Sequence, residues 1–199
     1  MPIACKVYEL GESGKLALLR EALRDGVEAV DMKLTLTEAT SLSLRGIAEL
    51  VGRRRSVVFE AFSFRGKLYL IVAAGKKLAR KVAARIAEAA GVDAREAELA
   101  SRKISRLCEG RVVKLVVFGM VKVPGLRRVM FAGDAVSDTD IFKDFSRLGE
   151  VKYVVFEDES GALLGVSDSF SVVMFSKSTE EELIELVKEK LLPLAAEEL

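Results

Sequence analysis

The sequence contains no histidine, asparagine, glutamine or tryptophan. Without histidine, the chain cannot build a Ser-His-Asp or Cys-His catalytic arrangement, and it offers no imidazole ligand to a metal. Without asparagine and glutamine, it lacks the side chains that read adenine through paired amide hydrogen bonds. The loss of thermolabile amides, together with a charged fraction of 31%, is typical of thermophilic proteins and predicts a thermophilic source.

Cysteine is also scarce, because Cys5 and Cys108 are the only two and they lie far apart in the sequence. They form no CxxC pair, so we expect two small buried side chains in a reducing compartment rather than a disulfide framework. The first fifteen residues carry no apolar signal segment. The apolar runs 68–75 and 115–121 are too short to span a membrane. These features predict a cytoplasmic protein without membrane contact.

The net charge of +1 conceals a strong polarity along the chain. Residues 51–130 contain 19 Lys and Arg against 6 Asp and Glu, a net charge of +13 (19 − 6). Residues 131–199 contain 6 against 16, a net charge of −10 (6 − 16), and residues 1–50 contain 6 against 8, or −2 (6 − 8). A basic middle next to an acidic end is the feature of this sequence that points most directly to function.

A four-residue stretch occurs twice, as Val57–Glu60 and as Val154–Glu157, at an offset of 97 residues (154 − 57). A glycine precedes both copies at the same offset, Gly52 and Gly149, and a glycine-containing turn follows each copy. Recurrence of the flanks together with the motif predicts an internal duplication.

The periodicity of the apolar residues predicts helices and strands in a regular order. We expect helices near residues 16–23, 41–51, 76–90, 93–109 and 138–148, and a last helix opened by a capping box at Ser178–Glu181 and ended by Pro193. We expect strands near residues 3–9, 27–37, 56–65, 68–74, 111–121, 126–132, 151–157, 162–166 and 170–175.

This order predicts an α+β fold made of duplicated strand-helix-strand-hairpin-helix half-repeats. The half-repeats would cover about residues 27–91 and 124–192, and a connecting helix and strand would lie at 92–123. No linker rich in Pro, Gly or Ser separates them, so we expect one pseudo-twofold globular body over residues 1–199. The order of elements is similar to that of the duplicated saddle of TATA-binding proteins and of tandem ferredoxin-like folds. The resemblance covers element order alone, which many unrelated functions share.

The helix predicted at 76–90 has the sharpest division of charge. Five apolar side chains occupy one face of the helical wheel, and basic side chains occupy the other. The helix predicted next aligns further arginines, and three arginines precede the first copy of the repeated stretch. The candidate nucleic-acid-binding residues are Arg53, Arg54, Arg55, Lys77, Arg80, Lys81, Arg85, Arg95, Arg102, Lys103 and Arg106. These cations would bind phosphate and release counterions. The alternative is a solvated face whose cations pair with the acidic half of the chain.

Acidic residues gather in the last helix, at Glu180, Glu181, Glu182, Glu185 and Glu189. The first three favour the positive end of the helix dipole, and the helix could also bind a basic surface on another subunit. A second acidic group consists of Asp134, Asp138, Asp140 and Asp144. Its spacing matches no calcium loop, and no glycine pattern matches a nucleotide cradle, so we predict neither a bound metal nor a nucleotide cofactor.

Phe59, Phe62 and Phe64 alternate along one strand. An outward-facing member could stack on bases, whereas core packing on both faces is the competing interpretation. We predict a non-enzymatic protein that binds the RNA or DNA backbone with low sequence specificity through its basic central surface. Two alternatives stay open. One is a self-associating structural or adaptor protein that uses opposed basic and acidic faces, as a homo-oligomer or with a protein partner. The other is a small-molecule enzyme with carboxylate, Lys or Ser chemistry.

Overall fold

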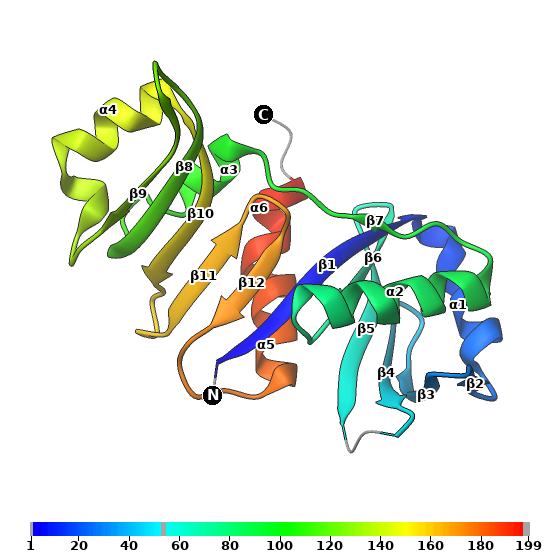
Figure 1. Ribbon diagram of the computed structural model, residues 1–199. Coiled ribbons are helices and arrows are strands. Elements are labelled where there is room, and N and C mark those ends of the chain that lie inside the picture. The colour runs from blue at the N-terminus through cyan, green and yellow to red at the C-terminus, as the bar shows by residue number, and fades with distance from the viewer. Residues whose placement is uncertain (1, 53–54, 197–199) are drawn as a thin grey trace. The chain divides into compact units, whose positions relative to one another are not determined.

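The computed structural model describes residues 2–52 and 55–196 and shows a mixed α+β fold of antiparallel strands and helices (Figure 1). The chain divides into two compact units. The N-terminal unit comprises Ile3–Ala97 and Thr179–Lys188, and the C-terminal unit comprises Pro2, Glu98–Ser178 and the residues from Glu189 onward. Within the described ranges, no helix has the length and apolar character that crossing a membrane requires.

The N-terminal unit contains an antiparallel sheet with the strand order β2-β3-β4-β5-β6-β1, and β7 also pairs with β1. Its strands are β1 (Ile3–Glu12), β2 (Val27–Glu28), β3 (Met32–Ala39), β4 (Ser43–Leu50), β5 (Ser56–Phe64), β6 (Lys67–Val72) and β7 (Arg95–Glu96). The turn between β5 and β6 is tight because Arg65 and Gly66 both take positive φ, at 47° and 78°. Two consecutive left-handed residues suit the twist of a hairpin, and the predicted β5–β6 hairpin is confirmed.

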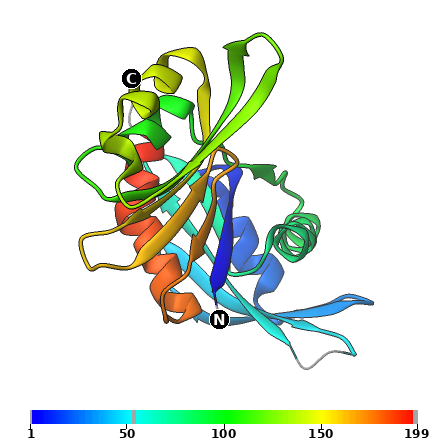
Figure 2. The same cartoon turned by 60° about the vertical axis from the view of Figure 1, so that its left-hand side comes forward.

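Helices cover both faces of this sheet. Helix α1 (Leu16–Leu23), which follows the short helix η1 (Ser13–Lys15), packs with α2 (Lys76–Ala90) around Val57 and Phe59 of β5. Helix α5 (Glu180–Leu186) contacts β1 and β5. Lys188, in the turn that follows α5, pairs with Glu60, which points away from Phe59 because side chains alternate along a strand. Figure 2 shows α1 and α2 on one side of these strands and the orange α5 on the other.

The C-terminal unit contains an antiparallel sheet with the order β12-β11-β10-β8-β9. Its elements are α3 (Ser101–Arg106), β8 (Val113–Val123), β9 (Leu126–Ala132), η2 (Val136–Asp138), α4 (Asp140–Leu148), β10 (Glu150–Glu157), β11 (Leu163–Ser167) and β12 (Ser171–Met174). A π-helical turn (Val187–Leu191) follows α5, and α6 (Leu192–Ala196) follows that turn. Phe118 of β8 packs against Phe142 and Phe145 of α4, with ring centroids 5.7 and 6.2 Å away.

The helix predicted at 41–51 is wrong, because these residues form strand β4. Leu44 and Ala48 are buried, as the helical pattern required, but Gly46 between them lies against Phe59 and Thr35 and marks a strand. Gly52, with φ of 76°, lies in the turn after the strand and does not close a helix. The proposed equivalence of 41–51 with 138–148 therefore fails, because α4 is a helix. The duplication and the pseudo-twofold axis are not confirmed.

Other elements also differ from the prediction. The strand expected at 27–37 divides into β2 and β3, and Val30 between them is 96% exposed. The helix expected at 93–109 shortens to α3, since Arg95 and Glu96 instead pair with β1 as strand β7. Pro193 does not end the last helix, because α5, the π-helical turn and α6 form one uninterrupted helical run over residues 180–196. The capping box is present one residue later than predicted, between Thr179 and Glu182, with both of its hydrogen bonds formed.

Candidate nucleic-acid interface

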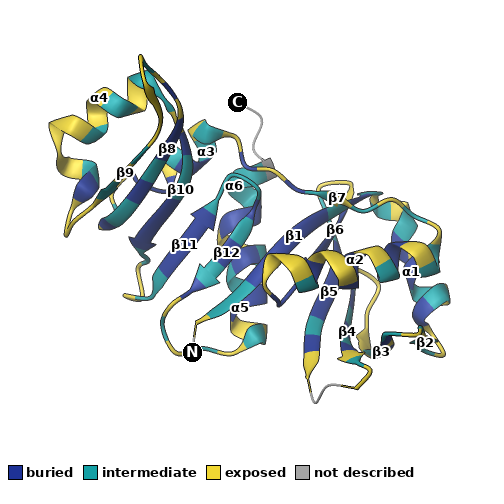
Figure 3. Cartoon of the chain, viewed as in Figure 1, coloured by how far each residue is buried: buried dark blue, intermediate teal, exposed yellow. Residues whose placement is uncertain are grey.

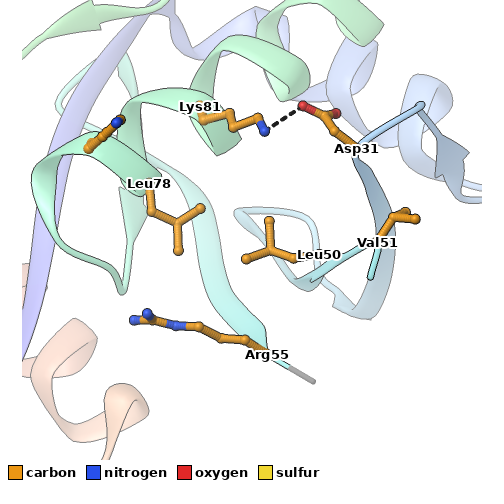
Figure 4. Close-up of a pocket in the computed structure, with 7 residues that line it drawn as sticks. Asp31, Leu50, Val51, Arg55, Leu78 and Lys81 are labelled. Atoms are coloured by element: carbon orange, nitrogen blue, oxygen red, sulfur yellow. Dashed lines mark ion pairs between the residues drawn. The ribbon is translucent and has the colours of Figure 1, made fainter. Parts of the chain in front are cut away.

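Cations of α2 border a hollow of about 390 Å³ in the N-terminal unit. Its lining residues are Asp31, Leu50, Val51, Arg55, Lys77, Leu78 and Lys81. Figure 4 shows Leu50 and Leu78 facing one another between Arg55 and the ion pair of Lys81 with Asp31. The hollow therefore combines an apolar centre with three cations and one carboxylate.

The amphipathic sequence of α2 places these cations on the surface. The side chains that face the sheet are small or branched and buried: Ala79, Val82, Ala83, Ile86 and Ala87. Lys77, Arg80 and Lys81 are exposed on the opposite side, which Figure 3 shows in yellow. The helix starts after Gly75 and ends at Gly91, whose φ of 64° gives a left-handed cap. The predicted extent and faces of this helix are confirmed.

Asp31 neutralises part of this basic face. Its carboxylate lies 2.7 Å from Nζ of Lys81 and 3.3 Å from Nε of Arg85. The hydrogen bond from Lys81 and the charge of Arg85 hold the pKa of Asp31 below its usual value. Arg85 also pairs with Glu88 one turn further along the helix, at 2.7 Å. These carboxylates fix the positions of the Lys81 and Arg85 side chains, and they also offset the positive charge of both residues.

Glu96 of β7 neutralises the N-terminal end of α2. Its carboxylate lies 2.6 Å from Arg80, 3.0 Å from Lys6 and 3.7 Å from Lys76. The hydrogen bonds from Arg80 and Lys6 lower the pKa of Glu96 to about 2. Lys6 is fully buried, and this burial lowers its pKa although Glu96 acts in the opposite direction. The cluster ties β1, β7 and α2 together.

We expect Glu96→Gln to destabilise the protein in a pH-dependent way. Because the pKa of Glu96 is lower in the folded chain than the ordinary value of 4.5, the charged carboxylate stabilises the fold above that pH. This contribution is lost as the pH falls toward about 2. Urea unfolding of both proteins from neutral to acidic pH should show a stability difference that shrinks in this window. A difference independent of pH would contradict the assignment.

The structure distributes the remaining predicted cations unevenly. Arg55 and Lys77 are exposed, and their side chains form no hydrogen bond or ion pair with any described residue, although Arg55 interacts electrostatically with Glu180 of α5. Arg95, on β7, borders a separate hollow of about 430 Å³ that also contains Glu9, Glu12 and Asp93. The cations of α3 belong to the C-terminal unit, where Arg102 and Arg106 are exposed and Lys103 donates a hydrogen bond to the carbonyl of Ala195. Arg53 and Arg54 lie outside the described residues.

The acidic helix α5 contacts its own sheet instead of the cations of α2. Glu185 lies 2.6 Å from Arg45 of β4 and 3.2 Å from Lys188. Glu180 accepts a hydrogen bond from the backbone N–H of Val58, and burial raises its pKa. The described ion pairs of α2 go to Asp31, Glu88 and Glu96.

Sequence reasoning missed a buried charge network on the face of the sheet that α5 contacts. Glu60 of β5 is only 2% exposed, and each of its carboxylate oxygens lies 2.6 Å from a cation, Arg45 or Lys188. The hydrogen bond to Glu60 raises the pKa of Arg45, and the bonds from Lys188 to Glu60 and Glu185 raise the pKa of Lys188 although burial lowers it. The one available signal was a glutamate within the apolar stretch Val57–Phe62, since a buried carboxylate needs a cation.

Two of the three phenylalanines of β5 are buried and offer no surface to bases, whereas Phe64 is half-buried with Cζ of Arg65 5.5 Å from its ring centroid. Phe59 is fully buried in the core with α1 and α2, and Phe62 is buried with Lys188 lying 5.4 Å from its ring centroid. Core packing on both faces is therefore the correct interpretation for these two side chains.

The described part of the chain contains no group of three or more His, Cys, Asp or Glu side chains that could hold a metal. Thr139 caps α4, and Asp140 lies in its first turn. Cys5 and Cys108 are buried, and burial raises the pKa of Cys108 to about 12, which disfavours the nucleophilic thiolate. No protein-family model matches the sequence, and no curated protein matches it.

Proposed function

We propose that the N-terminal unit binds the phosphate backbone of nucleic acid at the basic hollow formed by α2, Arg55 and the turn after β4. The observation that carries the proposal is that Arg55 and Lys77 have no ion-pair partner among the described residues and border the same hollow as Lys81. Guanidinium and ammonium groups bind phosphate oxygens by charge-assisted hydrogen bonds. Arg53 and Arg54 precede Arg55 in the sequence and add to the local positive charge.

The expected binding is weak and tolerant of sequence. Asp31 offsets one of the three cations that line the hollow, so few phosphates are neutralised. The chain has no Asn or Gln to read adenine edges. Contacts of this kind give dissociation constants on the order of micromolar or weaker and a steep dependence on salt.

The double variant Arg55→Glu/Lys77→Glu is expected to weaken binding of a labelled oligonucleotide by more than about tenfold. Each lost phosphate contact removes about one unit from the slope of log affinity against log salt, so the slope should fall by about two. Fluorescence anisotropy between about 50 and 200 mM salt measures both quantities, because counterion release is large across this range.

A matched control keeps the change in net charge but moves it away from the hollow. Lys33 and Lys67 are exposed cations of the same unit, each paired with a surface carboxylate. Lys33→Glu/Lys67→Glu should leave most of the affinity. Equal losses in the two double variants, or no binding by the wild-type protein at low salt, would refute the proposal. An oligomer that dissociates in salt, detected by light scattering in the same samples, would favour self-association instead.

A further inference from the structure

The sheet of the C-terminal unit has one fully buried face. The side chains on this face are 0–1% exposed at Val116, Phe118, Val154, Phe156, Val166 and Val172. Helices α3 and α4 contact β10 and β8, and in Figure 2 they lie together on one side of these strands. This face is the core of the unit.

The opposite face of the same sheet is apolar but not covered. Directly paired residues share a face, so the register places Met130, Val117 and Tyr153 side by side across β9, β8 and β10. Met130 is 64% exposed, whereas Val117 and Tyr153 are half-buried. Phe175, just after β12, is 42% exposed. An exposed apolar patch of this kind marks an interaction surface.

A glycine allows two aromatic rings to lie on this face. A Cβ at Gly165 of β11 would meet the hydroxyl oxygen of Tyr153 at 2.1 Å and a ring carbon of Phe175 at 3.2 Å. Both aromatic side chains therefore approach the backbone of β11 at Gly165, where any larger residue would displace them. Flat rings on an open sheet are the arrangement on which unpaired bases stack.

Cations border Tyr153 on the side of the sheet that faces β9. A hollow of about 660 Å³ is lined by Val117, Arg127, Arg128, Lys152, Tyr153 and Asp168, among others. Arg127 and Arg128 are exposed and have no ion pair in the described chain, whereas Lys152 pairs with Glu150 and Asp168 at 2.7 and 3.3 Å. Lys122 lies near the end of β8, close to Arg127 and Arg128 in the sequence, and residues 121–133 contain no Asp or Glu. The rim of this face is thus basic.

Met120 adds a second feature at the same hollow. It takes φ of 53°, which is unfavourable for a side chain with a Cβ, in an irregular part of β8, and its side chain is 70% exposed. A strained backbone that presents a large apolar side chain to solvent is typical of a binding site.

We propose that this open face of the C-terminal unit binds single-stranded nucleic acid, with bases stacked on Tyr153 and Phe175 and phosphates held by Arg127 and Arg128. A single strand is the expected ligand because a duplex hides the faces of its bases. The basic rim favours a polyanion over a second copy of the same basic face. The inference rests on observations separate from those at the N-terminal hollow.

Tyrosine fluorescence tests the stacking directly. The chain has no Trp, and Tyr8 and Tyr69 are 2% and 7% exposed, so Tyr153 is the tyrosine that a ligand can reach. Binding of a thymidine homo-oligonucleotide should quench the tyrosine emission after correction for its absorbance. Tyr153→Phe should lose this quenching, because the two tyrosines that remain, Tyr8 and Tyr69, are buried.

Removal of the ring should weaken binding. Tyr153→Leu and Phe175→Ser are each expected to bind the single strand about 5- to 100-fold more weakly, the range for loss of one base stack. Phe175 is exposed, so Phe175→Ser keeps the test valid if Tyr153→Leu disturbs the sheet. Ile141→Ser, which removes an apolar side chain of α4 that is 48% exposed, is the matched control and should bind normally.

The outcomes separate this inference from the proposed function. Loss of single-strand binding in Tyr153→Leu and Phe175→Ser, with no effect of Arg55→Glu/Lys77→Glu, would support the open face and refute the N-terminal hollow. The reverse pattern would support the hollow and overturn the open face. Wild-type binding by both aromatic variants, or a dimer that Phe175→Ser converts to a monomer without any nucleic-acid binding, would also overturn it.

Discussion

Glu60→Gln is expected to lower the free energy of unfolding by about 3 kcal/mol or more, since removal of one partner from a buried ion network leaves charge uncompensated. The carboxylate of Glu60 is 2% exposed and lies 2.6 Å from both Arg45 and Lys188. After the substitution, these two cations would share Glu185 alone. Glutamine keeps the size of the side chain, so the effect reports charge and not a cavity.

The measurement is unfolding in urea followed by circular dichroism, because guanidinium would itself screen the charges. Glu9→Gln is the matched control, since it removes a carboxylate that lies 3.0 Å from Lys67 in a pair 35% and 54% exposed. An exposed pair contributes about 0–1 kcal/mol. Similar losses in the two variants would show that the buried network does not stabilise the N-terminal unit.

Gly46→Ala is expected to cost about 3 kcal/mol, near the upper end for overpacking a core. A Cβ at Gly46 would lie 2.5 Å from Cζ of Phe59 and 2.6 Å from the carbonyl oxygen of Thr35. The phenyl ring can move, but the carbonyl belongs to the backbone of β3, so strands β3 and β4 would have to separate.

Gly14→Ala provides the control, because no heavy atom lies within 4 Å of a Cβ there. It should change stability little. In the double variant Gly46→Ala/Phe59→Leu, removal of the phenyl ring should relieve only part of the cost, since the contact with Thr35 remains. If Gly46→Ala and Gly14→Ala have equal stability, the close approach of β3, β4 and β5 is wrong.

The sequence was sufficient where one local pattern decided the structure. The buried stripe of α2 repeats at helical spacing between two glycines, and nothing else competes with that pattern. Likewise, the Arg65-Gly66 turn and the capping box at Thr179, which was predicted to within one residue, depend on neighbours within a few residues. Such local signals do not require knowledge of tertiary contacts.

The stretch 41–51 was ambiguous because Leu44 and Ala48 fit both a helical and a strand period. Glycine within a helix is unfavourable, so Gly46 was a signal for the strand. A glycine is needed at position 46 because the Phe59 ring of the neighbouring strand leaves no room for a Cβ there, and no local pattern reveals that contact.

The charge partners of the candidate site were also beyond local reasoning. Asp31 and Glu96 reach α2 from a turn and from strand β7, and each lies within the N-terminal unit. The charge distribution along the sequence suggested the glutamates of the last helix as alternative partners for the basic surface. In the structure, Glu185 of α5 instead pairs with Arg45 and Lys188. This tertiary pairing decides which cations, such as Arg55 and Lys77, have no ion-pair partner among the described residues.

Helix α5 gives the N-terminal unit an unusual order of synthesis. Residues Ile3–Ala97 leave the ribosome first, but Thr179–Lys188 complete their unit only after residues 98–178 have been made. During that interval, Glu60 and Arg45 lack Lys188 and Glu185, and their face of the sheet lacks its helix. Joining distant parts of a chain carries an entropic cost and slows folding. The strands of the N-terminal unit therefore reach their final stability only after Thr179–Lys188 has been translated.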